Sequence, residues 1–217
     1  MVETGIMHTE IVYNESKTSR YRLTKIWDAS KPRAMVLMTN ASTADVVSID
    51  YTTLYTIKNL DAIGFGGVDI LNMSSLITVK LEIPKYGEIM EESENITHIV
   101  NAAEKADKIL IAWGKLGENN KKVRLLQLKI LDQLKQYEEK IYGITNDLTS
   151  DSLYHPLAPQ IRFEWILTPY EFPKPQPPAE EVKETKATKN KKSHRADGAD
   201  LPLPETMPET ENTDESA

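Results

Sequence analysis

Residues 34–45 read A-M-V-L-M-T-N-A-S-T-A-D, an apolar run that passes directly into a polar segment. Residues 35–38 are all apolar, which is typical of a strand covered on both faces in a parallel sheet. Five of the next seven residues carry hydrogen-bonding side chains: Thr39, Asn40, Ser42, Thr43 and Asp45. Because open α/β sheets bind ligands beyond the carboxyl ends of their strands, this stretch predicts a binding site at a strand end.

On either side of this stretch, strand-like and helix-like patterns alternate. Residues 11–13 and 20–27 predict an antiparallel hairpin at the N-terminal end. Further strands are expected over 34–38, 68–71, 108–113, 141–145 and 162–167, and helices over 52–63, 92–106 and 121–140. Asp50 is the expected N-cap of the first helix, and Gly64 its expected stop. The expected apolar face of the first helix consists of Leu54, Ile57 and Leu60, and that of the third helix of Val123, Leu126, Ile130, Leu134 and Tyr137. The alternation predicts a three-layer α/β/α fold with a mostly parallel central sheet and right-handed crossovers.

The chain divides by composition into a domain over residues 1–170 and a tail over 171–217. The tail has spaced prolines, a basic cluster over 189–195 and eleven acids against seven bases, with little to bury. We therefore expect it to be disordered, and able to recruit a protein partner. Of the net charge of −7, the tail carries −4 and the domain −3, which disfavours a protein that coats DNA through a bulk basic field.

Composition also excludes several kinds of chemistry. The 217 residues include no cysteine, so disulfides, thiolate zinc sites, iron–sulfur clusters and cysteine nucleophiles are excluded. No apolar run approaches the roughly 18 residues that span a bilayer, and residues 1–10 lack the pattern of a secretory signal. We expect a cytoplasmic protein with no membrane partner.

Polar or aromatic residues follow the other expected strands too. Asn72 follows the strand over 68–71, and Trp113 and Lys115 mark the end of the next strand. If the sheet is parallel, these strand ends meet along one edge, where they suit a flat heterocycle, a sugar or a phosphate. Two other interpretations stay open: residues 42–45 also fit a helix capping box, and Trp113 also fits a core position.

His155 stands out because it precedes Pro156 in a loop. A residue before proline is held extended, and a histidine with a pKa near neutrality can donate a hydrogen bond to a developing anion. The other three histidines, His8, His98 and His194, form no ligand pattern with it, so we expect no metal site. Phosphate-loop, dinucleotide and nucleophile-elbow motifs are missing, and residues 64–67 (G-F-G-G) fit a helix-to-strand turn, so no cofactor is expected.

The ordered motifs resemble an uncharacterised family of bacterial and phage proteins, a domain of unknown function. Its pattern of L-N-P-S-T-A-D, D-P-T, W-G and G-x-T…H-P-L corresponds here to residues 39–45, 50–52, 113–114, 143–145 and 155–157. Ala41 and Tyr51 replace prolines of the family pattern, which is expected to loosen both turns.

A more distant similarity is to the uracil-DNA glycosylases, which have a polar first strand end, a later W-G and an H-P-S-P-L loop. By that resemblance Asn40 positions the attacking water, His155 stabilises negative charge on the departing base, and Leu157 lies near the loop that wedges into the duplex. Here the loop reads H-P-L-A-P, so the wedge is altered.

Three hypotheses follow. The chain is a glycosylase-like enzyme acting on a base in DNA or on a nucleotide, with a basic rim formed by Lys115, Lys121, Lys122 and Arg124. Alternatively it is a non-catalytic module that binds a nucleotide or nucleic acid in the same crevice. The third hypothesis is an interaction protein that acts through its tail.

Overall fold

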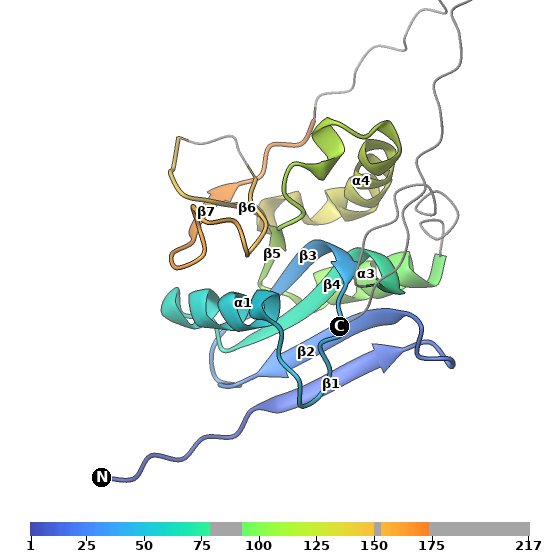
Figure 1. Cartoon of the computed structure of the whole chain (residues 1–217). Coiled ribbons are helices and arrows are strands. Elements are labelled where there is room, and N and C mark those ends of the chain that lie inside the picture. Colours follow the sequence, from blue (N-terminus) through green and yellow to red (C-terminus); the bar gives the residue numbers. More distant parts are fainter. Residues whose placement is uncertain (79–92, 150–152, 174–217) are drawn as a thin grey trace, which may run out of the picture. The chain divides into compact units, whose positions relative to one another are not determined.

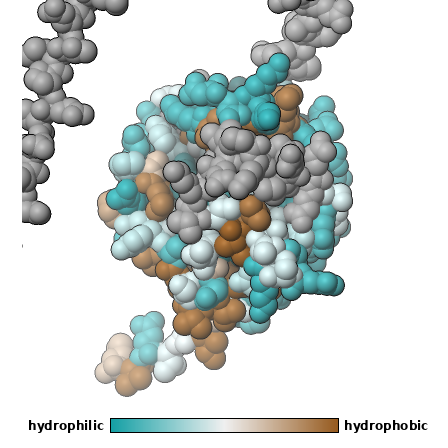
Figure 2. All heavy atoms as spheres, turned by 45° about the vertical axis from the view of Figure 1, so that its right-hand side comes forward, coloured by the Kyte–Doolittle hydropathy of each residue, from teal (hydrophilic) through white to brown (hydrophobic). Residues whose placement is uncertain are grey.

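The computed structural model describes residues 1–78, 93–149 and 153–173 of the chain. Most of the expected tail, including the basic cluster over 189–195, lies outside the described residues. Along the part of the chain that is described, no helix is long and apolar enough to cross a membrane. On the face drawn in Figure 2, apolar residues lie among hydrophilic ones.

The described residues form a seven-stranded sheet with the order β1-β2-β4-β3-β5-β6-β7 (Figure 1). The strands are β1 His8–Tyr13, β2 Arg20–Ile26, β3 Arg33–Ala41, β4 Gly67–Ile77, β5 Lys108–Ile111, β6 Ile141–Thr145 and β7 Ile166–Pro169. Strand β3 runs parallel to β4 and β5, and β5 runs parallel to β6. The pairs β1–β2, β2–β4 and β6–β7 are antiparallel.

The prediction of a mostly parallel sheet is therefore wrong, because the sheet is mixed. The predicted N-terminal hairpin is present, and it extends the sheet through the antiparallel pairing of β2 with β4. At the other edge, β7 returns along β6 without an intervening crossover helix. Only the central strands, which are joined through helices, keep the parallel arrangement that crossover connections require.

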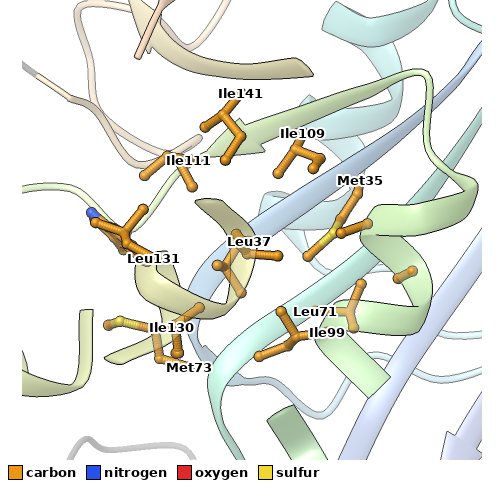
Figure 3. Packing of buried hydrophobic residues seen from close by; sticks show 14 of the residues in the cluster. Met35, Leu37, Leu71, Met73, Ile99, Ile109, Ile111, Ile130, Leu131 and Ile141 are labelled. Carbon is orange, nitrogen blue, oxygen red and sulfur yellow. The ribbon is translucent and has the colours of Figure 1, made fainter. Parts of the chain in front are cut away.

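Helices cover both faces of this sheet, which confirms the three layers. Helix α1 (Tyr51–Ala62) packs on one face, and α3 (Ser93–Lys105) and α4 (Lys121–Leu134) pack on the other. A hydrophobic core lies on each face of the sheet, and alternate residues of β3 point into one or the other. Met35 and Leu37 pack with α3 and α4 (Figure 3), whereas Val36 and Met38 lie on the α1 side. The unbroken apolar run is thus a strand buried on both faces.

The helices begin where the sequence predicts, but α1 packs differently from the prediction. The Asp50 carboxylate accepts the Thr53 N–H at 2.7 Å, which confirms the expected N-cap. The expected apolar face is confirmed only at Leu60, because Leu54 is exposed and Ile57 is half-buried. The other buried residues of the helix are Thr53, Thr56 and Asn59. Polar side chains are tolerated on this face because the helix backbone satisfies them: Thr56 donates to the Thr52 carbonyl at 2.7 Å.

On α4 the expected apolar face is confirmed by buried Val123, Leu126, Ile130 and Leu134. The helix ends at Leu134, and Lys135–Lys140 continues as the 3-10 helix η2, so the predicted single helix to residue 140 is too long.

Two further boundaries matter for the site. Strand β4 runs to Ile77 rather than to Leu71, so Asn72 lies within the strand and not in a loop after it. The helix-to-strand turn over residues 64–67 is confirmed, with Gly64 at φ +93°. A Cβ on Gly66 would lie 1.9 Å from the Asp28 carbonyl oxygen, so this turn leaves no room for a side chain there.

Candidate functional site

A cavity of about 380 Å³, which we call the polar pocket, opens beside the carboxyl end of β3. Strands β2, β3 and β4, the start of α1 and the loop that carries His155 all contribute to its walls. Its lining residues are Arg20, Met38, Asn40, Ser42, Thr43, Asp50, Thr52, Thr53, Ile70, Asn72, Thr78, His155 and Leu157.

Six residues predicted from the sequence meet in this pocket: Asn40, Ser42, Thr43, Asn72, His155 and Leu157. The strand period explains two of them. Met38 and Asn40 share one face of β3, Ile70 and Asn72 share the same face of β4, and Met38 pairs directly with Asn72. Two amides that are 32 positions apart in sequence are thereby brought to one wall.

Asp45 lies outside the pocket. It is exposed, and its Oδ1 accepts the N–H groups of Ser48 at 2.7 Å and Val47 at 2.8 Å. These hydrogen bonds, from Ser48 first and then from Val47, lower the pKa of the Asp45 carboxyl. The capping-box interpretation of residues 42–45 is wrong, because no helix begins there and Asp45 closes a local turn instead.

Trp113 and Lys115 also lie outside the pocket. Trp113 is buried in the core on the α4 side, and it lines a second cavity of about 440 Å³ together with Gln127 and Tyr170. Lys115 directly precedes the short helix η1 (Leu116–Glu118) and lines neither cavity. Of the expected basic rim, Arg124 lines the second cavity rather than the polar pocket.

The W-G strand end instead supports the His155 loop. Gly114 adopts φ +62°, and a Cβ placed on it would lie 3.6 Å from both the backbone nitrogen and the Cβ of His155. The Trp113 carbonyl accepts the Thr39 hydroxyl at 3.3 Å, which joins this turn to β3. The motif therefore lies against the His155 loop without lining the pocket.

One hydrogen bond orients the His155 ring, and another holds its backbone. Its Nδ1 accepts the Leu157 N–H at 3.3 Å, and its carbonyl accepts the Ala158 N–H at 2.7 Å. Burial lowers the pKa of His155, and the nearby Asp50 charge only partly opposes this effect. The imidazole is therefore neutral at pH 7, with its proton on Nε2, which makes it a hydrogen-bond donor that carries no charge.

Two charged residues of the pocket were missed as site residues. Arg20 is 2% exposed, and its NH1 donates to the Ala44 carbonyl at 2.8 Å, which pins the polar segment after β3. Asp50 was predicted only as a helix cap. Asp50 could have been predicted as a site residue, because it is an N-cap carboxylate that closely follows the candidate site. Arg20 could not, because nothing in the sequence distinguishes it from the other residues of the predicted hairpin strand.

The charges of Arg20 and Asp50 respond to burial in different ways. Burial lowers the pKa of Arg20, although Asp50 and Tyr13 oppose the shift. Burial alone would raise the pKa of Asp50, but hydrogen bonds from Ser42 and Thr53, with the Arg20 charge, lower it overall. The pocket thus holds one cation and one anion at neutral pH.

Several polar groups of the pocket keep unused hydrogen-bonding capacity. Asn72 is 1% exposed, yet its Nδ2 has no acceptor among the described residues, and neither has Nε of Arg20. The Asn40 Nδ2 makes only long contacts of 3.5 Å, to the carbonyls of Ala41 and Thr78. Buried polar groups are normally paired, so these donors favour a ligand that carries carbonyl or ring-nitrogen acceptors.

A metal would need a different set of residues. Within residues 1–78, 93–149 and 153–173, no three His, Cys, Asp or Glu side chains gather as a metal ligand set.

Comparison with known proteins identifies a family. No curated protein and no solved structure matches the chain. The family described as "Protein of unknown function (DUF1643)" matches residues 20–157. The match begins at Arg20 and ends at Leu157, both of which line the polar pocket, so it includes every lining residue. The chain therefore belongs to this family of proteins of unknown function.

Proposed function

We propose that the polar pocket binds a nucleobase and that the chain hydrolyses the N-glycosidic bond that joins this base to its sugar. The observation that carries the proposal is the fixed, neutral His155, which shares a pocket with Asn40. A neutral donor of this kind stabilises an anionic leaving group without first binding it as an ion pair.

The charge balance of the pocket favours a neutral group over a phosphate. Arg20 and Asp50 offset one another, and the donors of Asn72, Asn40 and His155 match the carbonyl and ring-nitrogen acceptors of a base. A phosphate placed here would face the Asp50 carboxylate, which its hydrogen bonds keep ionised.

In the proposed reaction, water attacks the anomeric carbon of the sugar while the bond from this carbon to the base nitrogen breaks. The bonding electrons leave with the base, whose developing negative charge accepts a hydrogen bond from Nε2 of His155. The Asn40 amide oxygen orients the water, and the proton that the water loses passes to solvent. The products are the free base and a sugar with a hydroxyl at the anomeric carbon.

The test is base release by the purified full chain. Single- and double-stranded oligonucleotides that carry uracil, mismatched and modified bases, and free nucleotides, are assayed for released base and for alkali-labile abasic sites. We expect His155→Ala and Asn40→Ala each to lower the rate by about a hundredfold or more. His8→Ala and Asn101→Ala, which lie outside the pocket, are the matched controls and should keep full activity.

A non-catalytic binding module is the second candidate. It is favoured because Asp50 is the one carboxylate among the described residues that line the pocket, and Ser42 and Thr53 already engage it, which leaves it poorly placed to act as a general base. Saturable binding of a nucleoside with no base released, and loss of this binding in Asn72→Ala, would identify the module and rule out the hydrolase.

A further inference from the structure

Exposed aromatic side chains lie next to the polar pocket. Tyr51 is 73% exposed and Phe163 is 68% exposed, which is unusual for large rings. Tyr51 is the first residue of α1, between the pocket residues Asp50 and Thr52. Tyr51, Tyr55 and Lys58 follow one another at spacings of four and three, so they share one face of the helix.

Phe163 and Arg162 join this face from the loop before β7. The Phe163 ring meets the Tyr55 ring edge-on, with centroids 5.7 Å apart. Nζ of Lys58 lies 5.6 Å from the Phe163 centroid, and Cζ of Arg162 lies 5.8 Å from the Tyr55 centroid. We call Tyr51, Tyr55, Lys58, Arg162 and Phe163 the aromatic strip.

Hydrogen bonds join the strip to the pocket. Buried Asn59 donates from Nδ2 to the Arg162 carbonyl at 3.0 Å, which fastens the loop to α1. Arg162 in turn donates to the Leu157 carbonyl at 3.1 Å, and the Leu157 N–H bonds to His155. The part of the loop that carries Arg162 and Phe163 is therefore bonded both to α1 and to the part that carries His155.

The charge of the strip is positive. Its two cations lie against its rings, whereas the nearby Asp61 accepts Nε1–H of Trp27 at 3.1 Å and lies 3.8 Å from Nζ of Lys31. Glu164 follows Phe163 in sequence and is exposed. Exposed rings that accept stacked bases, flanked by cations that neutralise phosphates, are the chemistry of single-stranded nucleic acid binding.

We propose that the aromatic strip binds the strand that flanks a base held in the polar pocket, so that the substrate is a single-stranded polynucleotide and not a free nucleotide. This inference rests on the proposed function for the identity of the pocket's ligand. It assigns the stacking of neighbouring bases to Phe163 and Tyr51, and the phosphate contacts to Lys58 and Arg162.

The experiment measures binding of the full chain to a fluorescein-labelled single-stranded DNA of about 16 nucleotides by anisotropy. We expect the double variant Lys58→Gln/Phe163→Ala to bind at least about tenfold more weakly. The slope of log affinity against log salt should fall by about 0.7 in magnitude for the lost phosphate contact. Calorimetry with thymidine, a nucleoside without a phosphate, should give the same affinity for the variant and the wild type, because the pocket is intact.

Leu128→Ala/Lys129→Gln is the matched control, since it removes one exposed apolar side chain and one exposed cation from α4. Tyr51→Ala is a second test at an exposed position, should the double variant fail to fold. The inference is overturned if the folded strip variants bind DNA as tightly as the wild type does. It is also overturned if the wild-type chain binds no DNA, and a protein would then be the expected partner of the strip. Base release separates the two proposals: DNA binding through the strip without base release defeats the hydrolase alone, and base release from free nucleotides without DNA binding defeats the strip alone.

Discussion

Two groups of buried charged residues lie at opposite ends of the paired strands β3 and β4. They differ in whether the charged side chains have partners of opposite charge within ion-pairing distance. In the Asp69 cluster (Asp69, Thr24, Arg22 and Arg33), the carboxylate accepts hydrogen bonds from Thr24 and Arg33, and Arg22 Nε lies 3.9 Å away. In the polar pocket, by contrast, no carboxylate of a described residue lies within ion-pairing distance of Arg20.

The difference separates a structural use of buried charge from a use in binding. The Asp69 carboxylate is 3% exposed and finds its cations on the neighbouring strands, so the fold itself completes the interaction. Arg20 and Asp50 line a cavity instead, where Nδ2 of Asn72 has no acceptor among the described residues. The unpaired Nε of Arg20 does not distinguish the two groups, because Nε of Arg22 and of Arg33 is unpaired as well. A buried charge that the fold leaves incomplete is the stronger indication of a ligand site.

The largest effect that we expect is a loss of stability on substitution of Asp69, the carboxylate at the centre of the Asp69 cluster. Asp69→Ala removes the buried carboxylate. Arg33 is then left without an anion among the described residues, and Arg22 keeps only Glu10 as a partner. Because removal of one partner leaves uncompensated charge, we expect the free energy of unfolding to fall by about 3 kcal/mol. Urea denaturation measures it, and a loss below about 1 kcal/mol would show that the cluster resembles an ordinary surface ion pair.

Much of this architecture could be predicted because it depends on local patterns. The apolar run of β3, the Asp50 cap and the buried face of α4 all follow from residue spacing along a single element. The resemblance to an uncharacterised family, a domain of unknown function, was also confirmed. The antiparallel share of the sheet could not be derived, since the side of the sheet on which a hairpin adds is set by long-range packing and not by the hairpin's own sequence.

The candidate site was predictable only in part for the same reason. Asn40 lies in the last residues of β3, which runs to Ala41 and is longer than predicted, and His155 lies in the loop after β6. The two residues do meet in one pocket. Arg20 was missed because its importance arises from a contact with the Ala44 carbonyl, 24 positions away, and from burial that a strand pattern does not reveal. Trp113 and Lys115 follow the carboxyl end of β5, at the same edge of the sheet as the site, but neither of them lines the polar pocket.

A smaller effect on stability, together with a loss of ligand binding, is expected on substitution of Arg20 in the polar pocket. Arg20→Met removes a buried cation that no ion pair compensates, at the loss of one hydrogen bond to the Ala44 carbonyl. The desolvation that is relieved offsets that bond, so we expect the free energy of unfolding to change by less than about 1 kcal/mol. Nucleoside binding to the polar pocket, measured by calorimetry, should fall by about tenfold or more, as expected for a lost hydrogen bond to a charged group.

The two arginines therefore predict opposite outcomes. Arg33→Met, which removes a partner of the buried Asp69 carboxylate, is the matched comparison and should destabilise the fold without altering nucleoside binding. If Arg20→Met proves as destabilising as Arg33→Met, Arg20 is a structural cation and the contrast between the two groups does not hold.

The smallest expected effect is a pH dependence of stability that His155 confers on the polar pocket. Its pKa is lowered in the folded chain by burial, with Asp50 as an opposing charge, so the folded state binds less proton than the unfolded state below the ordinary histidine pKa of about 6.5. By linkage, the free energy of unfolding falls as the pH drops from about 6.5 toward the lowered pKa, and it is unaffected by this group above that range. His155→Gln should flatten this part of the curve in urea denaturation at several pH values, whereas His8→Gln should leave it unchanged. An unchanged slope in His155→Gln would mean that the imidazole is protonated equally in both states, and the neutral donor on which the proposed chemistry depends would then be absent at mildly acidic pH.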